Sequence, residues 1–121
     1  MINDQNPKKY DLEDRTFQFA RNCRDFVNKL PKTTANVEYG KQLIRSSGSP
    51  AANYIEANDA LSKKDFIMRI KICRKEAKES RYWLSLLAAD NNLPPKDERR
   101  RLIQEATELM NIFGAILHKS E

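Results

Sequence analysis

The side chains best suited to bind a ligand are the cations between Ser62 and Tyr82. Eight basic and three acidic residues lie in this stretch, so it carries the same excess of +5 as the whole chain. Such a strip can attract a polyanion and contact its phosphates without reading a base sequence. It can equally be the solvated face of a helix. The candidate nucleic-acid-binding residues are Lys64, Arg69, Lys71, Arg74, Lys75, Lys78 and Arg81.

A second group of polar side chains begins in the segment from Gly40 to Glu56, which otherwise has the pattern of a buried helix. Arg45 lies eleven residues before Glu56, about three turns along one face, and either could meet a carboxylate of another helix. Buried polar groups cost free energy unless they are paired, so we expect a structural network, with a ligand or RNA contact as the alternative. Its predicted members are Arg45, Asn53, Glu56, Glu76 and Glu79.

Patterns for catalysis or metal binding are missing from the sequence. His118, the single histidine, falls in the last turn of a predicted helix, where a cation suits the helix dipole. Glu76 and Glu79 have no Glu-x-x-His partners of the kind that a di-iron site needs. Cys23 and Cys73 each lie on an apolar stripe, so we interpret them as reduced core thiols. We therefore expect a protein that is not an enzyme, with no catalytic residue, metal or cofactor.

Two aromatic residues, Tyr82 and Trp83, follow the basic strip. Aromatic side chains beside Arg and Lys can stack on the bases of single-stranded nucleic acid. Trp83 shares a row with Ile72 and Leu86, however, so we expect it to pack against a neighbouring helix or subunit. Phe17 widens the apolar face of another predicted helix. We expect a homo-oligomer whose interface includes Phe17, Trp83 and Leu86.

The composition limits the fold that positions these side chains. The chain has 121 residues, 32% of them charged, with three glycines and five prolines, as in a soluble helical protein of one domain. No apolar run approaches the roughly 18 to 20 residues that span a bilayer. The N-terminal residues include no apolar signal-peptide region. We therefore expect a cytoplasmic protein that does not bind a membrane.

Apolar residues at helical spacing predict four helices separated by turn signals. Leu30-Pro31 ends the first helix, because the residue before proline avoids helical geometry. Ser62 is the expected cap of the third helix. The predicted helices cover about residues 11–29, 34–58, 63–90 and 95–118.

The second predicted helix contains Pro50, which allows two interpretations. Either the segment breaks into two helices, or one long helix kinks at the proline. We favour the kink, because the apolar residues keep one helical phase across it. The short connections imply antiparallel neighbours. The sequence thus predicts an all-α, antiparallel up-down-up-down four-helix bundle over residues 11–121, its second helix kinked near Pro50, after a flexible N-terminal arm over residues 1–10.

Three stretches resemble one protein family. They are DLEDRTFQFA at Asp11–Ala20, YGKQLIRSSGSPAANYIEA at Tyr39–Ala57 and SKKDFIMRIKICRKEAKESRYWLSLL at Ser62–Leu87. Together they resemble the four-helix-bundle proteins that are encoded in intervening sequences of bacterial large-subunit ribosomal RNA genes. The resemblance covers nearly the whole chain. It implies an up-down bundle that assembles into a homopentameric ring.

A branch similar in fold is the accessory protein of diversity-generating retroelements, a basic pentamer that binds RNA and a reverse transcriptase. With this resemblance, we expect a non-enzymatic, basic, homo-oligomeric bundle that binds structured RNA or an RNA-associated protein such as a reverse transcriptase. The alternative is a protein-interaction scaffold with no nucleic-acid affinity. The two differ in salt dependence, because only phosphate contacts weaken steeply with ionic strength.

Overall fold

The computed structural model describes residues 7–87 and 96–121. These residues form four α-helices and no strand, which confirms the prediction of an all-α four-helix bundle. None of the described helices is long and apolar enough to cross a membrane. The helices are α1 (Pro7–Lys29), α2 (Thr34–Asn58), α3 (Lys63–Leu86) and α4 (Lys96–Ser120).

Local chemistry explains where the helices begin. The Ser62 side chain accepts a hydrogen bond from the backbone N–H of Asp65 at 3.0 Å and so caps α3, as predicted. Thr33 caps α2 in the same way. α1 begins at Pro7 instead of Asp11, because proline is well suited to the first helical turn. The predicted arm over residues 1–10 is therefore helical from Pro7, and the rest of it lies outside the described residues. The predicted last residues of the third helix, 88–90, and the turn that follows them up to residue 95 also lie outside the described residues.

Pro50 lies inside one continuous helix, so α2 does not break into two. The proline ring leaves the carbonyl of Ser46 without its usual helical donor. The buried carbonyl of Pro50 accepts a hydrogen bond from the thiol of Cys73 at 3.4 Å, which ties this part of α2 to α3. The kink near Pro50 stays a prediction.

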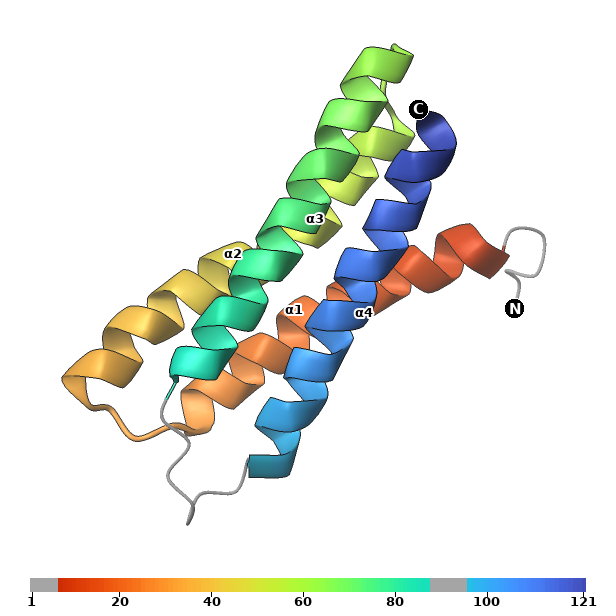
Figure 1. Cartoon of the computed structure of the whole chain (residues 1–121). Coiled ribbons are helices and arrows are strands. Elements are labelled where there is room, and N and C mark those ends of the chain that lie inside the picture. Colours follow the sequence, from red (N-terminus) through yellow and green to blue (C-terminus); the bar gives the residue numbers. More distant parts are fainter. Residues whose placement is uncertain (1–6, 88–95) are drawn as a thin grey trace.

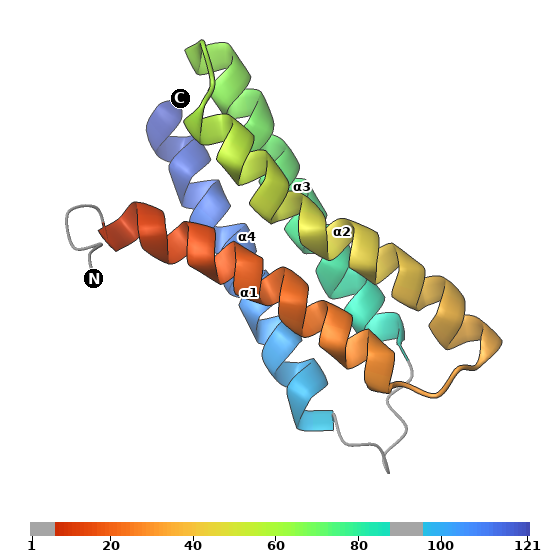
Figure 2. The ribbon, with the colours of Figure 1, turned by 180° about the vertical axis from the view of Figure 1, so that it is seen from behind.

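α3 makes the most extensive contacts, along both α2 and α4, while α1 packs along α2 and meets α4 over a shorter stretch. Successive helices run in opposite directions in Figure 1. Figure 2 shows α1 crossing α4, with the N-terminal end of α1 projecting away from the other helices.

The core lies where these helices face each other. Cys23 and Cys73 are both free and fully buried, which confirms their interpretation as core thiols. Burial raises the pKa of each thiol to about 12. The largest fully buried apolar side chains of the core are Phe19, Phe26, Leu43, Ile70, Leu84, Leu87, Leu109 and Phe113.

Candidate functional site

A groove of about 750 Å³ lies between α3 and α4. One wall carries four cations of α3, and the other wall and one end come from α4 and the residue that follows it. We call it the basic groove. Its lining residues are Lys71, Arg74, Lys75, Lys78, Met110, Gly114, Leu117, His118 and Glu121.

Helical spacing places the four cations on one wall. Lys71 and Arg74 are three residues apart, as are Lys75 and Lys78, and Arg74 and Lys75 are adjacent. This spacing directs all four side chains to the side of α3 that borders α4 and solvent. All four are exposed. None of them forms an ion pair with any described residue. The groove therefore carries four cations that form no ion pair with a described residue, and Glu121 is the one acidic residue that lines it.

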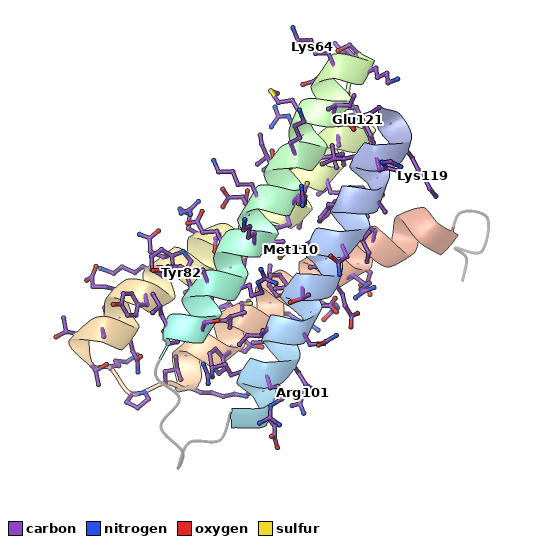
Figure 3. The ribbon with its side chains drawn as sticks, viewed as in Figure 1. Lys64, Tyr82, Arg101, Met110, Lys119 and Glu121 are labelled. Atoms are coloured by element: carbon purple, nitrogen blue, oxygen red, sulfur yellow. The ribbon has the colours of Figure 1, made fainter. Side chains whose placement is uncertain are left out.

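The opposite wall is shaped by a glycine. A Cβ atom on Gly114 would lie 3.6 Å from Nε of Arg74, so the arginine side chain extends across the surface of α4 at this position. The half-buried Met110 precedes Gly114 by one turn, and His118 follows it by one turn. Figure 3 labels Met110 on α4, facing α3.

The structure separates the other three predicted cations from this groove. Lys64 lies at the start of α3, as Figure 3 shows, beside a second hollow that it shares with Lys71. The guanidinium of Arg81 donates a hydrogen bond to Oγ1 of Thr107 on α4 at 3.4 Å. The sequence set thus divides into four groove cations and three residues with other surroundings.

Arg69 contacts α2, and its side chain is 34% exposed, so its surroundings differ from those of the four groove cations. Its Nη1 donates to Oδ1 of Asn53 at 3.0 Å, and its Nε lies 4.0 Å from the carboxylate of Asp65. Two residues at about 100° per residue make a rotation of about 200°, so Arg69 and Lys71 point about 160° apart around the helix. Its side chain consequently stabilises the contact between α2 and α3.

The predicted polar network forms in part. Nη1 of Arg45 donates to Oε1 of Glu76 at 3.1 Å, and Nη2 of Arg45 donates to Glu79. The indole N–H of Trp83 also donates to Glu79, at 3.1 Å. Burial raises the pKa of Glu79, but the hydrogen bonds from Trp83 and Arg45 outweigh it and hold the pKa below the ordinary value. These contacts link α2 to α3.

Two predicted members lie outside this network. Asn53 pairs with Arg69 and with its own helix at Ser49. Glu56 is exposed, and no described residue hydrogen-bonds with its carboxylate. The reason is the direction of the helices: α2 and α3 run in opposite directions in Figure 1, and Glu56 lies eleven residues, about three turns, beyond Arg45, the residue of α2 that pairs with Glu76.

The three predicted interface residues have different surroundings. Trp83 is half-buried, with its ring centroid 5.7 Å from that of Tyr39 on α2, so it packs within the chain. Phe17 is 55% exposed on α1, and Leu86 is 38% exposed on α3. Two of the three thus remain available on separate helices.

Sequence reasoning missed the α4 side of the groove. Met110 and Leu117 are apolar, so helical periodicity places them on the core-facing side of the fourth helix, and His118 was assigned to its last turn. The four-residue spacing of Met110, Gly114 and His118 could have placed them on one row. Which helix this row borders depends on the packing. No group of three or more His, Cys, Asp or Glu side chains within the described ranges could hold a metal ion.

Comparisons with known proteins agree with this architecture. A family model described as 23S rRNA-intervening sequence protein matches residues 8–115. The chain is also similar to a crystal structure of a protein with unknown function from the S23 ribosomal protein family of Bacteroides thetaiotaomicron VPI-5482. That likeness has a TM-score of 0.79 and 29% sequence identity, and it covers 92% of this chain and 98% of that chain. No curated protein matches the sequence.

Proposed function

This chain belongs to the 23S rRNA-intervening sequence protein family, and we propose that it is a non-enzymatic, basic, homo-oligomeric bundle that binds structured RNA through the basic groove. The observation that carries the proposal is the set of four exposed cations without an ion pair among the described residues. Several cations elsewhere are paired: Arg15 binds Glu105 at 2.6 Å, and Lys29 binds Glu98 at 3.1 Å. Phosphates are the ligands that such unpaired cations attract.

The groove cations act on the RNA backbone. Lys71, Lys75 and Lys78 supply point charges, while Arg74 presents a planar guanidinium that can grip one phosphate with two donors. Lys64 extends this positive path toward the start of α3. Contacts of this kind position an RNA without selecting its sequence.

Homo-oligomerisation is the second part of the proposal. Phe17 on α1 and Leu86 on α3 expose apolar surface on two different helices. A ring needs two different and complementary patches on each subunit, in contrast to the single patch of a two-fold dimer. The projecting end of α1 in Figure 2 offers a way to reach a neighbour. The number five, like a reverse transcriptase partner, rests on the family resemblance alone.

Binding to RNA is tested by reversing three charges of the groove. The variant carries Lys71→Glu, Lys75→Glu and Lys78→Glu, and its affinity for a labelled RNA stem–loop is measured by fluorescence anisotropy at several salt concentrations. Four phosphate contacts predict that the wild-type affinity falls about 50-fold to about 150-fold between about 50 mM and about 200 mM salt. The variant should bind far more weakly, and its salt slope should be shallower by about two to three.

A matched control changes the same charge elsewhere. Three exposed cations of α1, α2 and their connection are reversed together, and this variant should bind RNA nearly as the wild type does, apart from the loss of long-range attraction. Equal losses in both variants would mean that net charge alone attracts RNA, and unchanged binding in the groove variant would refute the proposal. The control substitutions are Arg24→Glu, Lys32→Glu and Lys41→Glu.

A protein-interaction scaffold is the second candidate, favoured by one observation. Leu61, between α2 and α3, is 100% exposed, and Met68 on α3 is 47% exposed. Met68 and Ile67 line the hollow near the start of α3. Exposed apolar side chains in one region are typical of a protein interface. A stable oligomer that ignores RNA at every salt concentration would support this candidate.

A further inference from the structure

We propose that the RNA bound in the basic groove presents an unpaired base, which stacks on the exposed ring of Tyr82. The inference rests on the proposed function and specifies its ligand: RNA with a loop, bulge or single-stranded segment beside the phosphates that the groove holds. Tyr82 is not used by the core or by the polar network, and its side chain is 58% exposed.

Helical geometry aligns Tyr82 with the groove cations. It follows Lys78 by four residues and Lys71 by eleven, so the three side chains lie within about 40° of each other around α3. Tyr82 is about 6 Å beyond Lys78 along the helix axis. Figure 3 labels Tyr82 near one end of α3 and Lys64 at the other, with the groove cations between them in the chain. A strand whose phosphates follow the lysines therefore brings a nucleotide to the aromatic ring.

The ring of Tyr82 is supported from within the protein. Its edge-on contact with Trp83 has a centroid distance of 5.1 Å and an interplanar angle of 69°. Trp83 is in turn held by Tyr39 of α2 and by its hydrogen bond to Glu79. Arg45 of α2 donates to the same carboxylate. An aromatic ring that is supported in this way loses little conformational freedom when a base stacks on it.

The chemistry favours an unpaired base over a duplex. In an A-form duplex the bases are paired and stacked inside the helix, so no base face is available to a tyrosine on the protein surface. Stacking of one base on an aromatic side chain changes affinity by about 5-fold to about 100-fold. Such stacking does not select the RNA sequence, because every base has a π-face. This agrees with a groove whose cations contact phosphates only.

The test compares two RNA probes, a 12-nucleotide oligouridylate and a fully paired RNA duplex of the same length. Both are titrated with wild-type protein and with Tyr82→Ala, Tyr82→Phe and Ile55→Ala. Ile55 is the control, because it is a similarly exposed apolar residue, 53% exposed on α2, outside the groove and the proposed subunit interface. We expect Tyr82→Ala to weaken oligouridylate binding about tenfold and to leave duplex binding unchanged. Tyr82→Phe and Ile55→Ala should bind both probes as the wild type does.

A second readout uses Trp83, the single tryptophan of the sequence. Its ring touches Tyr82, so oligouridylate should change the fluorescence of the wild-type protein, and the duplex should change it less. Light scattering of each variant checks that the subunit number is retained.

The possible failures are distinguishable. If the wild type binds neither probe, the proposed function is refuted and this inference with it. If both probes bind with groove-dependent affinity but Tyr82→Ala binds oligouridylate normally, only the stacking inference is overturned. A changed mass for Tyr82→Ala would identify Tyr82 as a subunit-interface residue and would overturn the inference as well.

Discussion

The close approach of α1 to α2 makes a specific prediction about Gly40. A Cβ atom at this buried position would lie 2.8 Å from Cγ1 of Val27, a separation that side chains cannot sustain. Valine in a helix has one strongly preferred rotamer, so its methyl group cannot rotate away at low cost. Gly40→Ala must therefore displace either Val27 or the α1 backbone.

The magnitude follows from two opposing effects. Alanine is more favourable than glycine in a helix interior by about 1 kcal/mol. Overpacking a well-packed contact costs about 1–3 kcal/mol. The net change at Gly40 should thus be a loss of roughly 0–2 kcal/mol in the free energy of unfolding. Gly48 lies on the same helix, and nothing is within 4 Å of the Cβ that alanine would add there. Gly48→Ala should therefore gain about 1 kcal/mol.

The assay is urea unfolding of both variants and the wild type at one protein concentration, because oligomers make apparent stability concentration-dependent. We expect Gly48→Ala to exceed Gly40→Ala by about 1–3 kcal/mol, or by at least about 4 °C in Tm. If the two variants are equally stable, or if Gly40→Ala is the more stable, α1 does not approach α2 as described here and the reasoning is refuted.

Three further predictions concern the interior. Ser46 and Ser80 share a buried hydrogen bond of 2.9 Å, so Ser80→Ala should cost about 1–2 kcal/mol in urea unfolding, and the double alanine variant should cost less than the two single changes combined. The pKa of Glu79 is lowered in the folded state, so its contribution to stability is present above the ordinary glutamate pKa of 4.5 and is lost as the pH falls through the folded-state pKa. The stability difference between wild type and Glu79→Gln should shrink from neutral pH to about pH 3, and a constant difference would contradict the assigned pairing. Cys23 and Cys73 are buried with pKa values raised to about 12, so a thiol reagent at neutral pH should modify them only after urea is added, and fast labelling of the native protein would count against their burial.

The features that could be predicted from the sequence depend on residues near each other in the chain. The cap at Ser62 is a local pattern of a serine followed by an acidic residue, and the structure has it. The apolar phase across Pro50 favoured one long helix, and α2 is continuous there. The pairing of Arg45 with Glu76 could also be predicted, because each is a polar residue on a helix of the bundle, and polar groups that become buried need partners.

Contacts between residues far apart in the chain could not be predicted in this way. Asn53 was placed with Arg45, and Arg69 with the groove cations, but the two bind each other. This pairing depends on which residues of α2 and α3 lie at the same level along the bundle. Residue spacing within one helix contains no information on that alignment.

The sequence by itself determined four helices, their apolar faces and a row of cations on the third, because helical periodicity and capping operate over a few residues. Only the tertiary structure decided that α4 completes the groove with Met110, Gly114 and His118. It also decided that Arg69 contacts α2, and that Tyr82 stays exposed while Trp83 is packed. These outcomes depend on the rotation and alignment of whole helices, which many distant core contacts set together.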